Sequence, residues 1–166
     1  RKRWSMDFFY PNLQNDMWRI FGLLFFHEKE HFLLPGKKAF HKEALVEFLT
    51  DKGIALYDTA TSVRRLLDNA SDKFLEVIEP TDIRLLLKQL PHCQAIVTTG
   101  QKATDIIRSQ IEVKEPAVGE SCPFEFEDRS LLLYRMPSSS RAYPLALEKK
   151  ADFYRLMLNE LGILQE

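Results

Sequence analysis

The feature that most constrains the fold is the segment QAIVTTGQKATDIIRSQI, residues 94–111. Its first part is a short run rich in β-branched residues, which predicts a strand. Gly100 follows and, with Gln101, precedes KATDIIRSQI, whose apolar residues recur with helical spacing. A strand, a glycine turn and a helix in direct succession are typical of α/β proteins, so we expect strands and helices to alternate along the chain.

The rest of the chain supplies elements of both kinds. The predicted helices are a segment beginning at Asn15 or Asp16 with Trp18, Phe21 and Phe25 on one face, HKEALVEFLTDKG ending at Gly53, DIRLLLKQL capped by Thr81, and residues 145–161 ending at Gly162. The predicted strands are IALY, residues 54–57, and a hairpin or two consecutive strands in FEFEDRSLLLYRM. Residues 58–79 show no clear pattern. This alternation predicts an α/β fold, a three-layer α/β/α sandwich with a mainly parallel central sheet.

Length and composition predict one soluble domain. The 166 residues are 45% hydrophobic, which is enough for one core, so we expect a single domain, 1–166. No apolar run approaches the roughly 20 residues of a membrane span, so we expect a cytoplasmic protein without a membrane partner. Two cysteines give no sign of a secreted disulfide framework, and we expect reduced thiols. The net charge of −1 argues against a histone-like nucleic-acid binder but leaves room for a local basic patch.

The motif HEKEH, residues 27–31, matches the spelling of a zinc-hydrolase site. In the H-E-x-x-H pattern two imidazoles, here His27 and His31, bind zinc one helical turn apart while the glutamate, here Glu28, activates water. The context argues against zinc, because Pro35 ends the helix four residues later. We therefore expect a charged turn at the end of an aromatic helix, with a zinc-dependent hydrolase as the third functional alternative.

The segment MPSSSRAYP, residues 136–144, follows an apolar run and precedes the last predicted helix. In an open parallel sheet ligands bind outside the carboxyl ends of strands, where this loop would lie. Small hydroxyls beside exposed backbone N–H groups suit phosphate oxygens. The alternative is structural, with Ser139 or Ser140 capping the first turn of the last helix. The residue types alone leave both interpretations open.

The same segment resembles the carboxyl-terminal motif of the mismatch-specific thymine and uracil DNA glycosylases, a branch of the uracil-DNA glycosylase superfamily whose loop reads MPSSS. Three other segments resemble that family in the same order along the chain: FFYPNLQNDMWRIFG, GIALYD and QAIVTTGQKATD. The resemblance implies a monofunctional glycosylase of DNA base-excision repair. Such an enzyme flips uracil or a mismatched thymine out of double-stranded DNA and hydrolyses its glycosidic bond. It implies no cofactor and no metal, and we expect a monomer.

The resemblance also assigns roles to single residues. Tyr10 falls where the family has an aromatic ring that stacks on the extruded base; the alternative is an ordinary core or surface aromatic. Asn15 matches a pocket-shaping asparagine, and is equally interpreted as a helix cap. Asp58 stands where the family has an asparagine that contacts the pyrimidine edge. A carboxylate offers acceptors alone unless it is protonated, so the preferred base is left open.

The loop residues would hold the DNA. By the same resemblance Pro137, Ser138, Ser139 and Ser140 grip the backbone, and Arg141, or the loop around it, fills the hole left by the flipped nucleotide. The uracil-specific branch has a histidine before this proline that stabilises the departing base, whereas this chain has Met136, a poor donor. We therefore expect backbone N–H groups to assist the leaving group and turnover to be slow.

The family's first motif, G-x-N/D/E-P-G, which positions the attacking water, is not found in these 166 residues. RKRWSMDFF resembles the segment that follows this motif, so we expect the first strand and the water-positioning residue to lie upstream of Arg1. The alternative is a catalytically inactive DNA- or nucleotide-binding homologue on the same fold.

Overall fold

The computed structural model of the protein describes residues 9–10, 12–36, 38–57, 60–65 and 75–165, and of residues 60–65 and 75–80 the backbone alone. It is of the mixed α/β class, with five helices and five strands among the described residues. The chain divides into two compact units. The first consists of Arg1–Leu56 together with Ser138–Glu166, and the second is Tyr57–Pro137.

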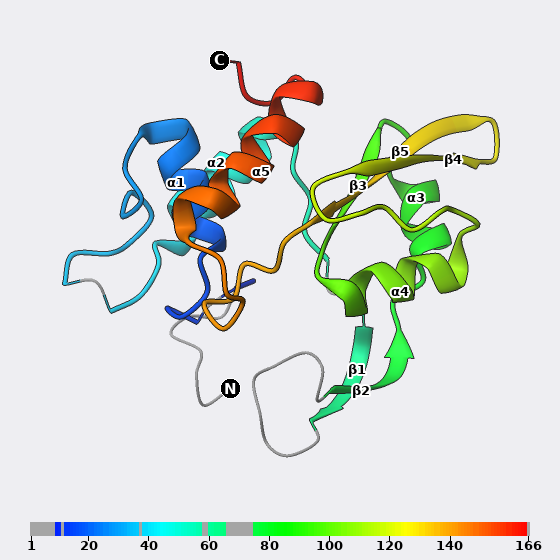
Figure 1. Ribbon diagram of the computed structural model, residues 1–166, viewed down its shortest axis with the longest axis horizontal. Helices are drawn as coiled ribbons and strands as arrows, with labels where there is room; N and C mark the ends of the chain where they lie inside the picture. The colour runs from blue at the N-terminus through cyan, green and yellow to red at the C-terminus, as the bar shows by residue number, and fades with distance from the viewer. Residues whose placement is uncertain (1–8, 11, 37, 58–59, 66–74, 166) are drawn as a thin grey trace. The chain divides into compact units, whose positions relative to one another are not determined.

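The first unit is helical (Figure 1). It contains α1 (Met17–Phe26), α2 (Lys42–Lys52) and α5 (Leu147–Glu160), and α1 packs against α5. Aromatic side chains fill its core: the ring of Phe21 lies 5.8 Å from that of Phe48 and 6.5 Å from that of Tyr154, measured between centroids. Edge-to-face ring pairs of this kind add to the free energy gained from burial.

Local sequence signals explain where these helices begin and end. The N-cap residue of α1 is Asp16, one of the two predicted candidates, but its side chain makes no capping hydrogen bond; the Met17 backbone N–H donates instead to Asn15 Oδ1 at 2.9 Å. His41 Nδ1 accepts from the Ala44 N–H at the start of α2, and Gly53 ends that helix in the left-handed conformation, as predicted. The last helix begins two residues later than predicted and ends, as expected, just before Gly162.

The second unit contains the three-stranded sheet, in the order β3-β5-β4 (Figure 1). The strand β3 (Ala95–Thr99) pairs in parallel with β5 (Arg129–Met136), and β4 (Ser121–Phe126) pairs with β5 as the predicted antiparallel hairpin. The helices α3 (Ile83–Gln89) and α4 (Gln101–Gln110) belong to this unit, so the predicted strand, Gly100 and helix succession is confirmed. One pairing is parallel and one antiparallel, so the described sheet is mixed rather than mainly parallel.

Two local predictions differ from the structure, and one sheet lies where no element was predicted. Residues 54–57, IALY, form no strand: they are irregular and alternately half-buried and exposed, and no described strand pairs with them. A two-stranded antiparallel sheet of β1 (Ala60–Arg65) and β2 (Leu75–Pro80) lies instead in the region without a clear pattern. The cap of α3 is Asp82, whose carboxylate accepts from the Leu85 N–H at 3.0 Å, rather than Thr81.

Two further expectations concern membrane-spanning helices and the state of the cysteines. Within the part of the chain that the structure describes, no helix combines the length and the apolar character required to span a bilayer. Cys93 and Cys122 are free thiols, as predicted.

Candidate functional site

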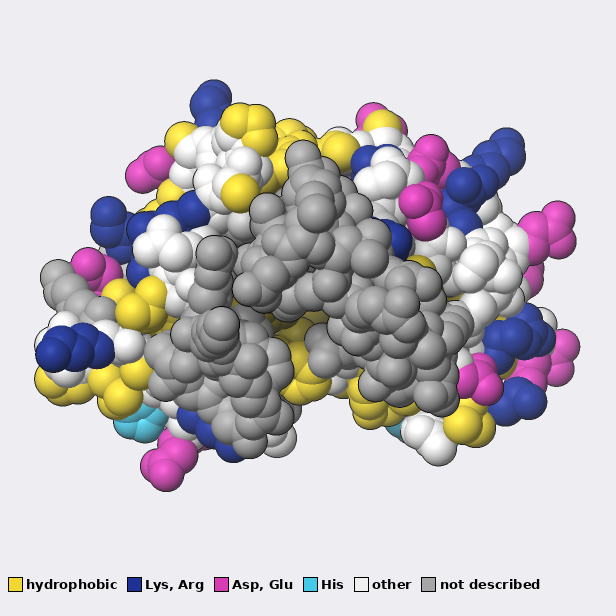
Figure 2. Space-filling view, turned by 90° about the horizontal axis from the view of Figure 1, so that it is seen from below, with side chains coloured by type: hydrophobic (Ala, Val, Ile, Leu, Met, Phe, Trp, Pro, Cys, Tyr) yellow, Lys and Arg dark blue, Asp and Glu magenta, His cyan; other side chains and the backbone are white. Residues whose placement is uncertain are grey.

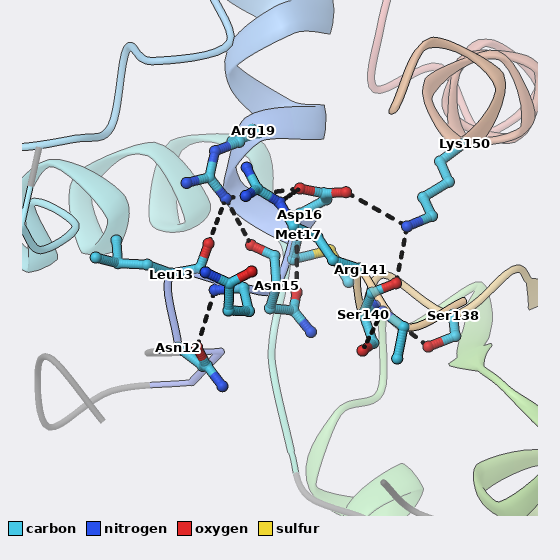
Figure 3. A network of polar contacts seen from close by, with 12 residues as sticks. Asn12, Leu13, Asn15, Asp16, Met17, Arg19, Ser138, Ser140, Arg141 and Lys150 are labelled. Carbon is cyan, nitrogen blue, oxygen red and sulfur yellow. Dashed lines mark hydrogen bonds and ion pairs between the residues drawn. The ribbon is translucent and has the colours of Figure 1, made fainter. Parts of the chain in front are cut away.

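The serine loop, defined here as residues 138–141, lies beside the segment that leads into α1 (Figure 3). The Asp16 N–H donates to the Ser139 carbonyl at 2.7 Å, and the Arg141 N–H donates to the Gln14 carbonyl at 2.9 Å. Between these bonds Asn15 and Ser140 form an isolated antiparallel bridge. Two segments far apart in the sequence, both in the first unit, are thus held together by backbone hydrogen bonds.

The serine hydroxyls stabilise the loop itself. Ser138 Oγ accepts from the Ser140 N–H at 3.3 Å, and Ser140 Oγ accepts from the Ala142 N–H at 3.2 Å. These are local turns in which a hydroxyl replaces a backbone acceptor. Ser139 is buried, with 2% of its surface exposed. The expected cap on the last helix is wrong, because α5 begins at Leu147 after an irregular stretch and its N-cap, Ala146, has no capping side chain.

A buried carboxylate, Asp16, lies beside the loop and close to three cationic side chains (Figure 3). Its oxygens lie 3.3 Å from Lys150 Nζ, 3.2 Å from Arg141 Nε and 3.6 Å from an Arg19 terminal nitrogen. Lys150 Nζ also donates to the Ser140 carbonyl at 2.8 Å. Because the side chains of Asp16 and Lys150 are 7% and 1% exposed, the interaction between these two is shielded from water and weakly screened by salt.

Arg19 holds the segment before α1 in place. Its guanidinium donates to the carbonyls of Leu13, at 2.8 Å, and Asn15, at 3.2 Å. Burial lowers the pKa of Arg19 below its usual value, and the neighbouring charge of Arg141 lowers it further. One terminal nitrogen of Arg19, Nη1, is thus engaged with the backbone before α1 and with Asp16.

Arg141 is the member of this cluster that reaches solvent. Its side chain is 48% exposed, and beyond the bond from Nε to Asp16 its guanidinium has no other partner among the described residues. It lines a cleft of about 350 Å³ in the first unit. The other lining residues are Asp16, Arg19, Lys29, Glu30, Leu33, Leu147 and Glu148. The charged residues of the lining are balanced in sign.

The surface charge is mixed as well. Figure 2 shows Lys and Arg side chains interspersed with Asp and Glu over the described part of one face. This distribution agrees with the net charge of −1 and makes local groups such as Arg141, rather than a broad positive field, the candidates for binding an anion.

Tyr10 and Asn15, which the sequence predicts to be partners in one site, both belong to the first unit. The Tyr10 ring meets that of Trp18 edge-on, with 5.8 Å between centroids and an interplanar angle of 80°. Tyr10 is half-buried and has φ of 48°, a left-handed conformation that is uncommon for a residue with a side chain. The oxygen of the Asn15 amide accepts from the Met17 N–H, while its nitrogen donates to no described residue.

Three other predicted residues lie elsewhere. Asp58 is outside the described residues. Pro137 is the last residue of the second unit, directly before the serine loop. Met136, at the end of β5, is fully buried, and its carbonyl accepts from the Gly100 N–H at 3.3 Å.

The HEKEH motif does not have the geometry of a zinc site. The helix α1 ends at Phe26, and His27 has the left-handed conformation of a C-cap, so residues 27–31 are not helical. The His31 ring stacks on Phe26 at 3.7 Å between centroids. No group of three or more potential ligands that could hold a metal ion occurs among the described residues. The charged turn that the sequence favoured is what the structure contains.

Comparison with protein-family models, with curated proteins and with solved structures finds no match to this chain.

Two residues of the cluster were missed by sequence reasoning. Asp16 was considered as a helix cap, and Lys150 was not considered because it stands in the polar run LEKK. A signal was present for Lys150: it precedes Tyr154, Met157 and Leu158 at helical spacing, which places it on the buried face of α5.

Proposed function

We propose that the protein is a monofunctional DNA glycosylase that removes uracil or a mismatched thymine from double-stranded DNA. The observation that carries this proposal is the pairing of the 14–16 segment with the serine loop by backbone hydrogen bonds. These are two of the four segments whose sequences resemble the mismatch-specific glycosylases. A single site built from both requires that they lie together, and within the first unit they do.

The proposed roles follow from the positions of the side chains. Tyr10 stacks on the everted base, and the Asn15 amide nitrogen, which has no described partner, donates to a pyrimidine oxygen. Ser138 and Ser140 hold the DNA backbone, and Arg141 fills the space that the base leaves. Ser139 is buried, so its part is to tie the loop to Asp16 rather than to contact DNA.

The reaction is a hydrolysis. The oxygen of a water molecule bonds to C1′ of the sugar as the bond from C1′ to the base nitrogen breaks. The electron pair of that bond leaves with the base, which takes up a proton, and the water loses one. Positive charge develops on the sugar and negative charge on the base, so the site must stabilise both. Met136 is a poor donor, and backbone N–H groups would assist the base, which predicts slow turnover.

The proposal extends to the fold and the setting of the protein. It implies a three-layer α/β/α sandwich with a mainly parallel central sheet, and a polar residue that positions the attacking water. It also implies a cytoplasmic monomer that works without a metal or organic cofactor.

A cleavage assay tests the proposal. The full-length protein, with any residues that precede Arg1, is incubated with duplexes that contain U·G, T·G or U·A, and abasic sites are revealed by alkali on a denaturing gel. We expect cleavage at the U·G or T·G position and none in a fully paired duplex without uracil. Absence of both cleavage and mismatch binding would end the proposal.

One observation favours a second candidate, a DNA- or nucleotide-binding homologue without activity. Met136 stands where the uracil-specific enzymes have a catalytic histidine, and it is fully buried. In the same assay this candidate predicts retention of mismatched duplexes in a gel shift without any strand cleavage.

A further inference from the structure

One buried side chain, Lys150, holds the serine loop in place. Lys150 lies on α5, and its ammonium group donates to the Ser140 carbonyl, at 2.8 Å, and to Asp16 Oδ2, at 3.3 Å. Lysine is rarely buried to 1% exposure unless it is paired. Lys150 therefore connects the last helix, the loop and the residue that precedes α1.

A buried ion pair of this kind is a weak explanation of stability alone. Removing an ammonium group and a carboxylate from water costs a large part of what their attraction returns, and apolar residues of similar size often stabilise a core as well. The pair also provides geometric specificity, because charged hydrogen bonds fix the positions of the groups that they join. Here those groups include the loop backbone at Ser140 and the Arg141 side chain.

Asp16 contacts both Lys150 and Arg141 and so links the two side chains. One of its oxygens accepts from Arg141 Nε at 3.2 Å while the other faces Lys150. The guanidinium is thereby held at its inner nitrogen, and its outer part is exposed. The backbone of Arg141 is fixed independently by its bond to Gln14.

We propose that Lys150 and Asp16 are positioning residues that hold the serine loop and aim Arg141 at DNA. This inference rests on the proposed function. A side chain that fills the hole left by a flipped base matters in a duplex, where unstacking must be compensated, and matters little in a single strand. Loss of the pair should therefore lower excision from duplex DNA selectively.

The test compares the double variant Asp16→Asn/Lys150→Met with the wild type in the full-length protein. The double variant removes one positive and one negative charge together, so Lys150 is not left buried without its carboxylate, and Arg19 keeps its bonds to the carbonyls of Leu13 and Asn15. Uracil excision is measured on a U·G duplex and on the single strand of the same sequence. We expect the ratio of duplex to single-strand rates to fall about tenfold, since charged hydrogen bonds are the stronger class. The control is Lys149→Met, at the exposed neighbouring position, which should keep the wild-type ratio.

A variant that is merely less stable loses both rates together, and an unchanged ratio overturns the inference. If the double variant does not fold, Lys150→Met alone, which leaves Asp16 paired with Arg19 and Arg141, should show the same selective loss. If the wild type excises uracil from neither strand, the proposed function fails. The positioning claim is then decided by hydrogen exchange, which should quicken about tenfold at the Arg141 and Ala142 amides but not in α2. Unchanged exchange at these amides overturns it.

Discussion

At the scale of single residues, the buried ion pair of Asp16 with Lys150 and the exposed ion pair of Asp152 with Arg155 should contribute differently to stability. Asp16→Ala leaves Lys150 buried without its carboxylate, so we expect the free energy of unfolding to fall by about 3–5 kcal/mol. Asp152→Ala removes a surface pair with Arg155 at 2.6 Å and should change it by less than about 1 kcal/mol. Urea denaturation measures both. Equal losses for the two variants would contradict the central place given to Asp16.

At the same scale, Tyr154 should make the free energy of unfolding depend on pH. Its burial raises its pKa well above the usual value of 10.0, and the charge of Tyr10 adds to this. The neutral phenol is favoured in the folded state, so its contribution to stability is complete below about pH 10. Above that pH the unfolded chain ionises first, and stability should fall by up to about 1.4 kcal/mol per pH unit.

The substitution Tyr154→Phe should remove this part of the slope. Urea denaturation between about pH 9 and 11 measures it, with Tyr57→Phe at an exposed position as the matched control. The same slope in wild type and Tyr154→Phe would show that another group is responsible.

At the scale of elements, two glycines with different surroundings should lose different amounts of stability when each is replaced by alanine. A Cβ on Gly22, inside α1, would lie 2.6 Å from the Glu28 carbonyl oxygen, so Gly22→Ala should destabilise the protein by about 1–3 kcal/mol although alanine favours helices. A Cβ on Gly53 meets open space, but φ of 70° disfavours it, so Gly53→Ala should cost about 1 kcal/mol. Thermal unfolding of both variants distinguishes them. A stabilised Gly22→Ala would show that the turn after α1 moves away from the helix.

Much of the element content was predictable because its signals are local. Periodic apolar residues, short polar residues before a helix and a glycine stop are properties of short windows, and α1, α2, β3 and α4 were found from them. IALY failed because strand formation depends on a neighbour, and no described strand pairs with these residues. The hairpin of β1 and β2 was missed because its residues carry no regular alternation.

The candidate site was predictable to a smaller extent. The resemblance singled out Tyr10, Asn15 and the serine loop, but no sequence pattern predicts that the loop lies against the 14–16 segment. The buried cluster of Asp16 and Lys150 was missed because polar residues are assigned to the surface by default. Burial of a charge depends on partners that come from distant parts of the chain.

At the scale of the whole molecule, charge predicts the salt dependence of DNA binding. With a net charge of −1 and mixed surface charge, binding should rest on few phosphate contacts near Arg141. We expect the logarithm of the association constant for an undamaged duplex to fall with the logarithm of salt concentration with a slope of about −2 to −3. Fluorescence anisotropy over a salt series measures it. A slope steeper than about −6 would indicate an extended basic surface instead.

The central claim is that the residues before α1 and the serine loop receive one everted pyrimidine. Photo-crosslinking of the full-length protein to a duplex with 5-iodouracil opposite guanine, followed by peptide mass spectrometry, tests it most directly. We predict an adduct on Tyr10 or elsewhere in residues 9–16, which disappears with an excess of unlabelled U·G duplex but persists with a fully paired one. Adducts confined to other parts of the chain, or competed equally by both duplexes, would contradict it.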